Sequence, residues 1–285
     1  MNPYHLFLSD LVRNIELAKC FRLGEYSSTS TIVIPESAPI VLIFSPHPDD
    51  ECITGALPLR LFREEKMKVI VVPVTFGSDK TQRQRRYDEL CGACNYLGFS
   101  LSIAQDGGFE QITPESRRTD TRSWDEYATR ISHLLESHRP KIILFPHSED
   151  QHSTHKGVHF LISDALAKTN YDFSCFIAET EYWRPITEPN LMIESGFDDV
   201  VDLITALSFH AGEVKRNPYH ISLPSWMIDN VRRGSEIVGK HEGGKAEDFQ
   251  FATLYRFRQW KAGQLTEVYA GGRRMSAKDR LFQLF

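Results

Sequence analysis

A stretch rich in histidine and aspartate follows an apolar run and reads Ser-Pro-His-Pro-Asp-Asp-Glu over residues 45–51. His47 and Asp50 supply nitrogen and oxygen donors of the kind that zinc accepts, and Pro48 fixes one backbone dihedral between them. Asp49 and Asp50 would repel each other in a dry pocket, so a nearby cation is the natural way to keep both ionised. We therefore favour a metal site over the alternative, in which an aspartate caps a helix and His47 is a surface histidine.

A second cluster of donors, residues 147–155, also follows an apolar run and reads His-Ser-Glu-Asp-Gln-His-Ser-Thr-His, with His159 further on. If both runs are neighbouring parallel strands, the two clusters meet at one sheet edge and form an open site with three ligands. His155 and His159 are four residues apart and share one side of a helix. Spacing alone leaves the choice between them open, although a lone helical histidine such as His159, and also His147, is more often structural.

Candidate strands and helices alternate along the first two thirds of the chain. The expected strands cover residues 40–44, 68–75, 100–104, 141–145 and 175–179, and the expected helices cover 52–65, 80–97, 123–138 and 155–168. Ser123 is a plausible N-cap of the third helix. This alternation predicts a three-layer α/β/α sandwich with a mostly parallel, Rossmann-like sheet, which places ligands at the carboxyl ends of its strands.

The pattern divides the chain into an N-terminal extension and one domain. Residues 1–37 form the extension, with a helix at 4–20 and a Ser/Thr-rich linker at 27–31; residues 38–285 form the domain, with a core at 38–183 and a pocket-shaping part at 184–285. The last part carries helical patterns at 200–210 and 225–239 and a Gly-rich break at 243–244.

Composition excludes several classes of protein. The formal net charge of −5 gives no basic excess for a nucleic-acid backbone. The apolar runs are far shorter than the roughly 20 residues of a membrane-spanning helix, and the N-terminus does not resemble a secretory signal. Five irregularly spaced cysteines indicate reduced thiols, so we expect a cytoplasmic protein. Cys91 and Cys94 form a CxxC inside a helical pattern, where two core residues are the favoured interpretation.

His47-Pro48-Asp49-Asp50-Glu51 followed by His152-x-x-His155 resembles the paired signature of the PIG-L/LmbE-like deacetylases, which remove acetyl groups from N-acetylglucosamine-type sugars. Weaker matches in the family's order span about residues 38–250 and leave the first 37 residues outside. They are Thr75-Phe76-Gly77, the helix from Arg86 to Gly98, Asp106-Gly107 and Ala246-Glu247-Asp248-Phe249.

The resemblance implies a role for each matching residue. His47, Asp50 and His155 would bind one zinc ion, and Asp49 would take the proton from the attacking water. His152 would stabilise the tetrahedral intermediate or protonate the departing amine. Arg86 and Asp106 match positions that contact the sugar. Thr154 departs from the family's pattern, because an aspartate often stands there and would raise the pKa of the catalytic histidine.

The expected function is therefore a zinc-dependent hydrolase that deacetylates an N-acetylated sugar or glycoconjugate. Two alternatives stay open: a zinc amidase for another small-molecule amide, and a non-catalytic sugar-binding relative, for which Thr154 is the only support. Five residues could line a sugar pocket or belong to the core and are not assigned: Tyr182, Trp183, His210, Trp226 and Tyr255. A homo-oligomeric state also stays open.

Overall fold

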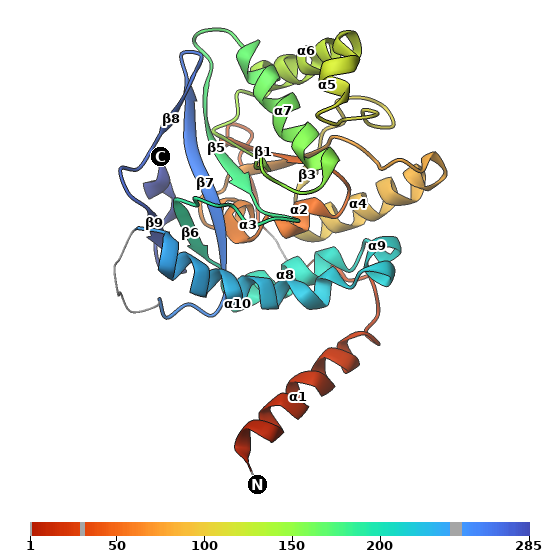
Figure 1. The fold of residues 1–285 in the computed structure, drawn as a ribbon, viewed down its shortest axis with the longest axis vertical. Coiled ribbons are helices and arrows are strands. Elements are labelled where there is room, and N and C mark those ends of the chain that lie inside the picture. The colour runs from red at the N-terminus through yellow and green to blue at the C-terminus, as the bar shows by residue number, and fades with distance from the viewer. Residues whose placement is uncertain (1, 29–31, 240–246) are drawn as a thin grey trace.

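The computed structural model describes residues 2–28, 32–239 and 247–285. Within these ranges one mixed sheet runs through the molecule (Figure 1). Its strands are β1 (Ile40–Ser45), β2 (Lys68–Pro73), β3 (Ser100–Leu101), β4 (Ile142–Pro146), β5 (Ser174–Thr180), β6 (Leu191–Glu194), β7 (Ala252–Lys261), β8 (Gln264–Glu267) and β9 (Arg273–Met275). They are ordered β3-β2-β1-β4-β5-β7-β6-β9, and β8 pairs with β7.

The first five strands are parallel and follow the order of a Rossmann sheet. β1 pairs with β2 from Ile40 opposite Lys68 onward, and with β4 from Val41 opposite Ile142. The chain leaves β1 toward β2 on one side and later returns to β4 on the other, so the strand order reverses between β1 and β4. The two strands that precede the predicted site clusters therefore end side by side at this reversal, where such sheets bind ligands.

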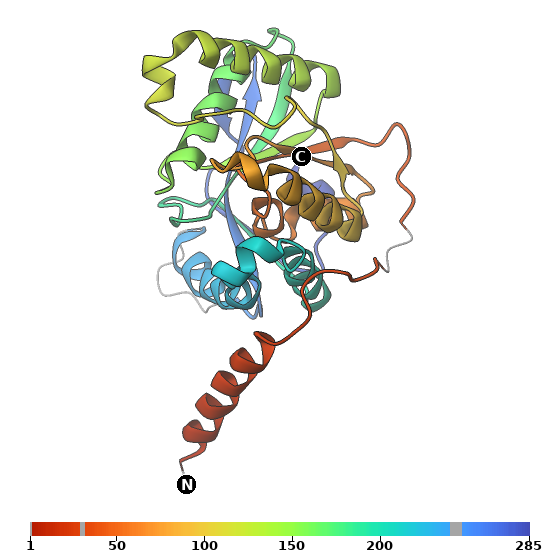
Figure 2. The ribbon, with the colours of Figure 1, turned by 90° about the vertical axis from the view of Figure 1, so that its right-hand side faces the viewer.

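Helices cover both faces of the sheet, as Figures 1 and 2 show. The helical elements are α1 (Pro3–Ala18), α2 (Asp50–Ile53), α3 (Ala56–Glu64), η1 (Lys80–Gln82), α4 (Arg83–Leu97), α5 (Ser116–Thr119), α6 (Thr121–His138), α7 (Ser153–Ala167), α8 (Phe197–Leu207), α9 (Ala211–Arg216), α10 (Tyr219–Ile237) and η2 (Leu281–Leu284). Alternate residues of β1 enter different cores: Val41 and Ile43 pack with α3, α4 and α8, while Leu42 and Phe44 pack with α6 and α7. The three-layer α/β/α prediction is confirmed.

Three local predictions need correction. The helix expected at 52–65 is two helices, because Gly55 between them adopts φ 82°, which an α-helix cannot continue through. The N-cap of α6 is Asp120, not Ser123, and the Asp120 carboxylate accepts a hydrogen bond from the backbone N–H of Ser123. The part after residue 183 adds strands as well as helices to the sheet, and β7 runs antiparallel to both β5 and β6.

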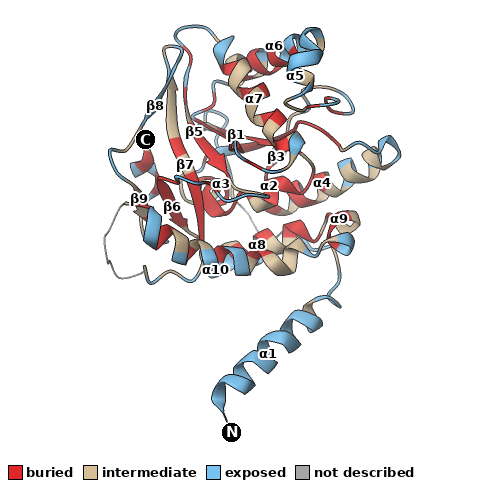
Figure 3. Ribbon diagram, viewed as in Figure 1, coloured by how far each residue is buried: buried red, intermediate tan, exposed pale blue. Residues whose placement is uncertain are grey.

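The N-terminal helix α1 extends away from the rest of the molecule and buries none of its residues (Figure 3). After it, the chain returns to the body, where the N–H of Gly24 donates to Ser208 Oγ at 3.1 Å. Residues 29–31 of the Ser/Thr-rich linker and the Gly-rich break at 243–244 lie outside the described residues. Among the described helices, none combines the length and apolar character needed to cross a membrane.

Candidate metal and active site

The turn after β1 is held by backbone and side-chain hydrogen bonds from the end of β2. The backbone N–H and the hydroxyl of Thr75 both donate to the carbonyl of Pro46, at 3.1 and 2.8 Å. Gly77 N–H donates to Thr75 Oγ1 at 3.3 Å. The Thr75-Phe76-Gly77 motif thus braces the turn that carries His47 and Asp50.

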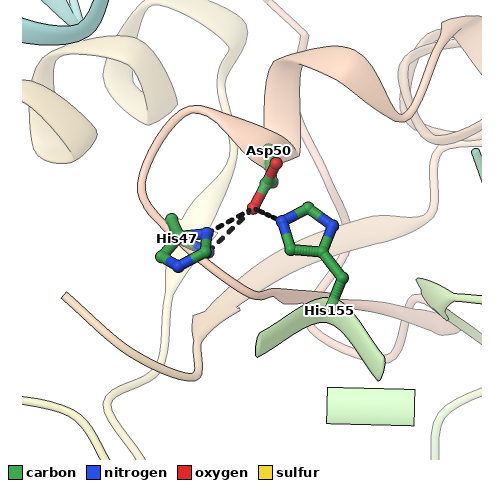
Figure 4. A group of neighbouring side chains, drawn as sticks. All are labelled: His47, Asp50 and His155. Carbon is green, nitrogen blue, oxygen red and sulfur yellow. Dashed lines mark hydrogen bonds and ion pairs between the residues drawn. The ribbon is translucent and has the colours of Figure 1, made fainter. Parts of the chain in front are cut away.

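His47, Asp50 and His155 converge from two elements at the reversal of the sheet (Figure 4). Asp50 Oδ2 lies 3.4 Å from His47 Nδ1 and 3.4 Å from His155 Nε2. The candidate ligand atoms of the three residues all lie within 4.8 Å of one another. The structure therefore brings together the three residues that the sequence predicted as metal ligands.

This donor set fits a zinc ion. Zinc binds such nitrogen and oxygen atoms at about 2.0–2.2 Å in a tetrahedron, which puts neighbouring ligand atoms about 3.3 Å apart. Both ring nitrogens of His155 are buried and have no hydrogen-bond partner among the described residues. Since a buried polar atom without a partner is costly, an ion at this position would satisfy Nε2, the ring nitrogen that faces Asp50.

Asp49 and Asp50 differ in the direction of their pKa shifts. Burial raises the pKa of Asp49 well above its usual value, and the neighbouring Asp50 charge adds to the shift. Burial acts in the same direction on Asp50, but His155 and His47 outweigh it, so the pKa of Asp50 is lowered. A divalent cation between these groups would favour the ionised form of both carboxylates.

Asp150 is the buried carboxylate that supports the second cluster. Its Oδ1 accepts the backbone N–H of His152 at 2.8 Å, and its Oδ2 accepts that of Trp183 at 3.2 Å. The same Oδ2 lies 3.7 Å from His155 Nδ1. Burial would lower the pKa of His155, but Asp50 and Asp150 raise it. Asp150 thus orients the candidate ligand, a role that sequence spacing did not reveal.

His152 lies beside the three candidate ligands, with its ring centroid 5.2 Å from that of His47 and 5.0 Å from that of His155. Burial and the two neighbouring histidines lower its pKa, against the weaker opposite effects of Asp50 and Asp150. Thr154 lies at the same cavity but carries no charge to counter this shift. The pKa of His152 is thus lowered even with Asp150 in place.

The two other histidines of this region have structural partners. His147 Nε2 lies 2.8 Å from the carbonyl of Arg184. His159 Nδ1 lies 3.0 Å from the carbonyl of Pro146 and 3.3 Å from Glu179 Oε1. Neither belongs to the group with His47 and Asp50. The geometry therefore separates His155 from His159, which the sequence spacing left open.

Asp49 lies at the same cavity, 7% exposed, with its backbone at φ 120° and ψ −33°. Residues other than glycine rarely adopt such a φ, which costs of order 1–3 kcal/mol and persists only where the surroundings enforce it. Asp49 precedes α2 but its side chain makes no capping hydrogen bond. The helix-cap interpretation of this aspartate therefore has no support in the structure.

A cavity of about 1030 Å³ opens over the cluster. Of the aromatic residues left unassigned, Tyr182, Trp183 and Trp226 line it, whereas His210 and Tyr255 are fully buried and do not. Tyr219 also lines it, between Trp183 and Trp226, with ring centroids 5.9 and 6.2 Å away. Sequence reasoning missed Tyr219, because α9 and α10 reach the cavity only through tertiary packing.

Of the two residues predicted to contact the sugar, one lines the cavity and the other does not. Arg86 lines the cavity, donates to the carbonyls of Phe76 and Pro48 at 3.2 and 3.4 Å, and pairs with Glu213 at 3.6 Å. Asp106 is exposed and is not among the described residues that line the cavity, although Phe109 of the same loop is. The structure brings Arg86, but not Asp106, to the cluster.

Residues 42–166 match the family model of the GlcNAc-PI de-N-acetylases, named PIG-L. The resemblance to the PIG-L family that the sequence motifs predicted is confirmed over this range, which includes both site clusters. A search of curated proteins found no match in sequence.

Several solved structures share the fold. The N,N'-diacetylchitobiose deacetylase from Pyrococcus horikoshii is 16% identical, with a TM-score of 0.56 over 78% of this chain and 84% of that one. The teicoplanin deacetylase Orf2, in a zinc-inhibited form, is 13% identical, with a TM-score of 0.53 over 78% and 98%. GalB, the 4-carboxy-2-hydroxymuconate hydratase from Pseudomonas putida KT2440, is 15% identical, with a TM-score of 0.51 over 77% and 95%. Since these include deacetylases and a hydratase, the likeness shows the fold and not the reaction.

Proposed function

We propose that this protein is a zinc-dependent amide hydrolase that removes the acetyl group from an N-acetylglucosamine-type sugar or glycoconjugate. The observation that carries the proposal is the convergence of His47, Asp50 and His155 at one cavity with Asp49 and His152 beside them. The match of residues 42–166 to the GlcNAc-PI de-N-acetylase model supports the same reaction class.

The residues have complementary roles in this proposal. Zinc held by His47, Asp50 and His155 would polarise the acetyl carbonyl and lower the pKa of the attacking water. Asp49 accepts the proton of that water while the water oxygen bonds to the acetyl carbon. The bond between carbon and nitrogen then breaks, and the nitrogen receives a proton from Asp49 or from His152. Acetate and a free amine are the products.

The cavity supports a carbohydrate substrate. Trp183 and Trp226 are 52% and 41% exposed while lining the cavity, so each offers an uncovered aromatic face. Such faces suit the apolar side of a sugar ring, and the charged Arg86 nearby suits its hydroxyl groups. The volume of about 1030 Å³ lies at the top of the usual range for small-molecule sites, which favours a glycoconjugate over a single sugar. We retain Asp106 in this proposal as a sugar contact, as the family resemblance implies.

We also propose that the protein acts in the cytoplasm.

Mass spectrometry of reaction products would test the proposal. The zinc-loaded protein would be incubated with N-acetylglucosamine, N,N'-diacetylchitobiose, larger N-acetylated glycoconjugates and a set of N-acetylated amides without sugar. We expect deacetylated sugar and an equal amount of acetate, and much less of both from Asp49→Asn. Hydrolysis of only the amides without sugar would replace the sugar by another substrate class. No hydrolysis of any compound, with zinc bound, would contradict the enzyme assignment.

A further inference from the structure

The strained backbone of Asp49 is held by a carboxylate that the proposed reaction does not use. The N–H of Asp49 donates to Glu51 Oε2 at 3.0 Å. Glu51 is 0% exposed and does not line the cavity. A buried carboxylate is retained only where its oxygens have strong partners, so the groups around Glu51 decide how firmly it holds Asp49.

The strongest partner of Glu51 comes from a distant part of the chain. His210 Nε2 lies 2.6 Å from Glu51 Oε1, and the Cys52 thiol donates to the same oxygen at 3.3 Å. His210 is also 0% exposed and stands between α8 and α9. The hydrogen bond from the imidazole N–H to the carboxylate fixes one oxygen of Glu51 and leaves the other for Asp49.

Glu51, Cys52 and His210 could also be considered as metal ligands, since their donor atoms lie close together. The 2.6 Å between His210 Nε2 and Glu51 Oε1 is a hydrogen-bond distance and is shorter than the roughly 3.3 Å between two ligands of one zinc ion. Burial and the nearby Glu51 also raise the pKa of the Cys52 thiol, which opposes the thiolate that a metal would need. These contacts fit a hydrogen-bonded chain and not a second metal site.

The segment that carries His210 also supports the turn after β1 at a second point. Glu213, one helical turn after His210, lies 3.6 Å from Arg86, whose guanidinium donates to the carbonyl of Pro48 at 3.4 Å. Pro48 directly precedes Asp49, and Glu51 follows two residues after it. The segment from His210 to Glu213 therefore supports the turn around Asp49 at two points, and Glu213 itself also lines the cavity.

We propose that His210 is a positioning residue for the reaction: through Glu51 it holds the backbone of Asp49 in the conformation that directs its carboxylate into the cavity. The proposal rests on the proposed function, in which Asp49 is the base. It assigns a role to a residue more than 150 positions from the turn, and the link consists of two hydrogen bonds.

Kinetics of His210→Phe would test this role, with His159→Phe as a matched control. Both changes remove a histidine beside a buried carboxylate, but His159, with a side chain 12% exposed, faces Glu179 and does not contact the turn. We expect His210→Phe to lower kcat by about 10- to 100-fold with little change in KM and with zinc retained, since a small misplacement of a reacting group has effects of this size. The control should keep the wild-type kcat. A wild-type kcat in His210→Phe would overturn the proposal.

A second pair of variants keeps the test decisive if His210→Phe does not fold. Glutamine at 210 can reach Glu51 with an N–H donor, whereas asparagine is one methylene shorter. We expect His210→Gln to restore most of kcat and His210→Asn to restore little. Equal values of kcat in the two variants would show that the hydrogen bond to Glu51 does not matter.

Two further measurements separate this proposal from the proposed function. In an Asp49→Asn background, His210→Phe should lower kcat no further, because both changes act through one group; an additive loss would exclude action through Asp49. Hydrogen exchange of the Asp49 amide should be faster in His210→Phe than in His159→Phe, whether or not a substrate is known. Unchanged exchange would break the proposed link, while absent deacetylation in the wild type with faster exchange would reject only the proposed function.

Discussion

The two loops that meet at the reversal of the sheet are built differently. The turn after β1 is braced by Thr75, by Arg86 and by the hydrogen bond from Asp49 to Glu51. In the loop before α7, by contrast, the main support is Asp150, and Nδ1 of His152 is buried without a partner among the described residues. Several hydrogen bonds thus hold the turn that carries the base and two candidate ligands, whereas none from the described part of the chain holds Nδ1 of His152.

The largest effect is expected from removing a ligand. His47→Ala or His155→Ala should lose bound zinc and with it nearly all hydrolysis, because two remaining donors do not hold the ion. Elemental analysis of the purified variants, against about one zinc per chain in the wild type, would measure this. His159→Ala is the control and should keep its zinc; the reverse result for His155 and His159 would exchange their roles.

A smaller loss is expected from Asp49→Asn, which keeps the size of the side chain and removes the proton acceptor. Zinc should remain, and kcat should fall by about 10²- to 10⁴-fold, the usual contribution of a positioned base. Metal content and kcat measured on the same preparation would separate the two roles. Loss of zinc from Asp49→Asn but not from Asp50→Asn would mean that the two carboxylates are exchanged.

The support of the second loop should matter less. Asp150→Asn removes the charge that faces His155 Nδ1, and we expect zinc affinity to fall by about 10- to 100-fold, as is usual for a group that orients a metal ligand. Competition with a chelator would give the dissociation constants. Glu149→Gln is the control, because the Glu149 carboxylate is exposed and bonds to Thr187. A similar loss in Glu149→Gln would point to loop charge in general.

The sequence predicted the parts of the fold and the site that depend on local patterns, but not those that depend on distant partners. β1 and β4 are continuous apolar runs, and their polar ends identified His47, Asp50 and the loop with His155 because parallel strands end at one edge. The helical spacing of His155 and His159 could not show that His159 bonds to the carbonyl of Pro146. β7 was missed although Tyr255 and Phe257 alternate with arginines as in a strand, since its partners β5 and β6 lie far away in the sequence. His210 was left unassigned, and its contact with Glu51 was missed for the same reason.

The smallest expected effect is at Thr154, which lies in the first turn of α7, two residues after His152, and lines the cavity. In the proposed reaction His152 acts in its protonated form, and burial lowers its pKa. An aspartate at 154 would stabilise the imidazolium and raise that pKa. The protonated fraction at neutral pH would then increase.

Thr154→Asp should therefore shift the upper limb of the pH profile of kcat/KM to higher pH, while the lower limb, set by Asp49 and the attacking water, moves less. His152→Ala is the control, since it should remove the upper limb and keep zinc bound. An unchanged upper limb in Thr154→Asp would mean that Asp150 already supplies enough negative charge, or that His152 is not the acid. A wild-type rate and profile in His152→Ala would decide for the second explanation, and both loops would then serve the metal while Asp49 carries the proton in both directions.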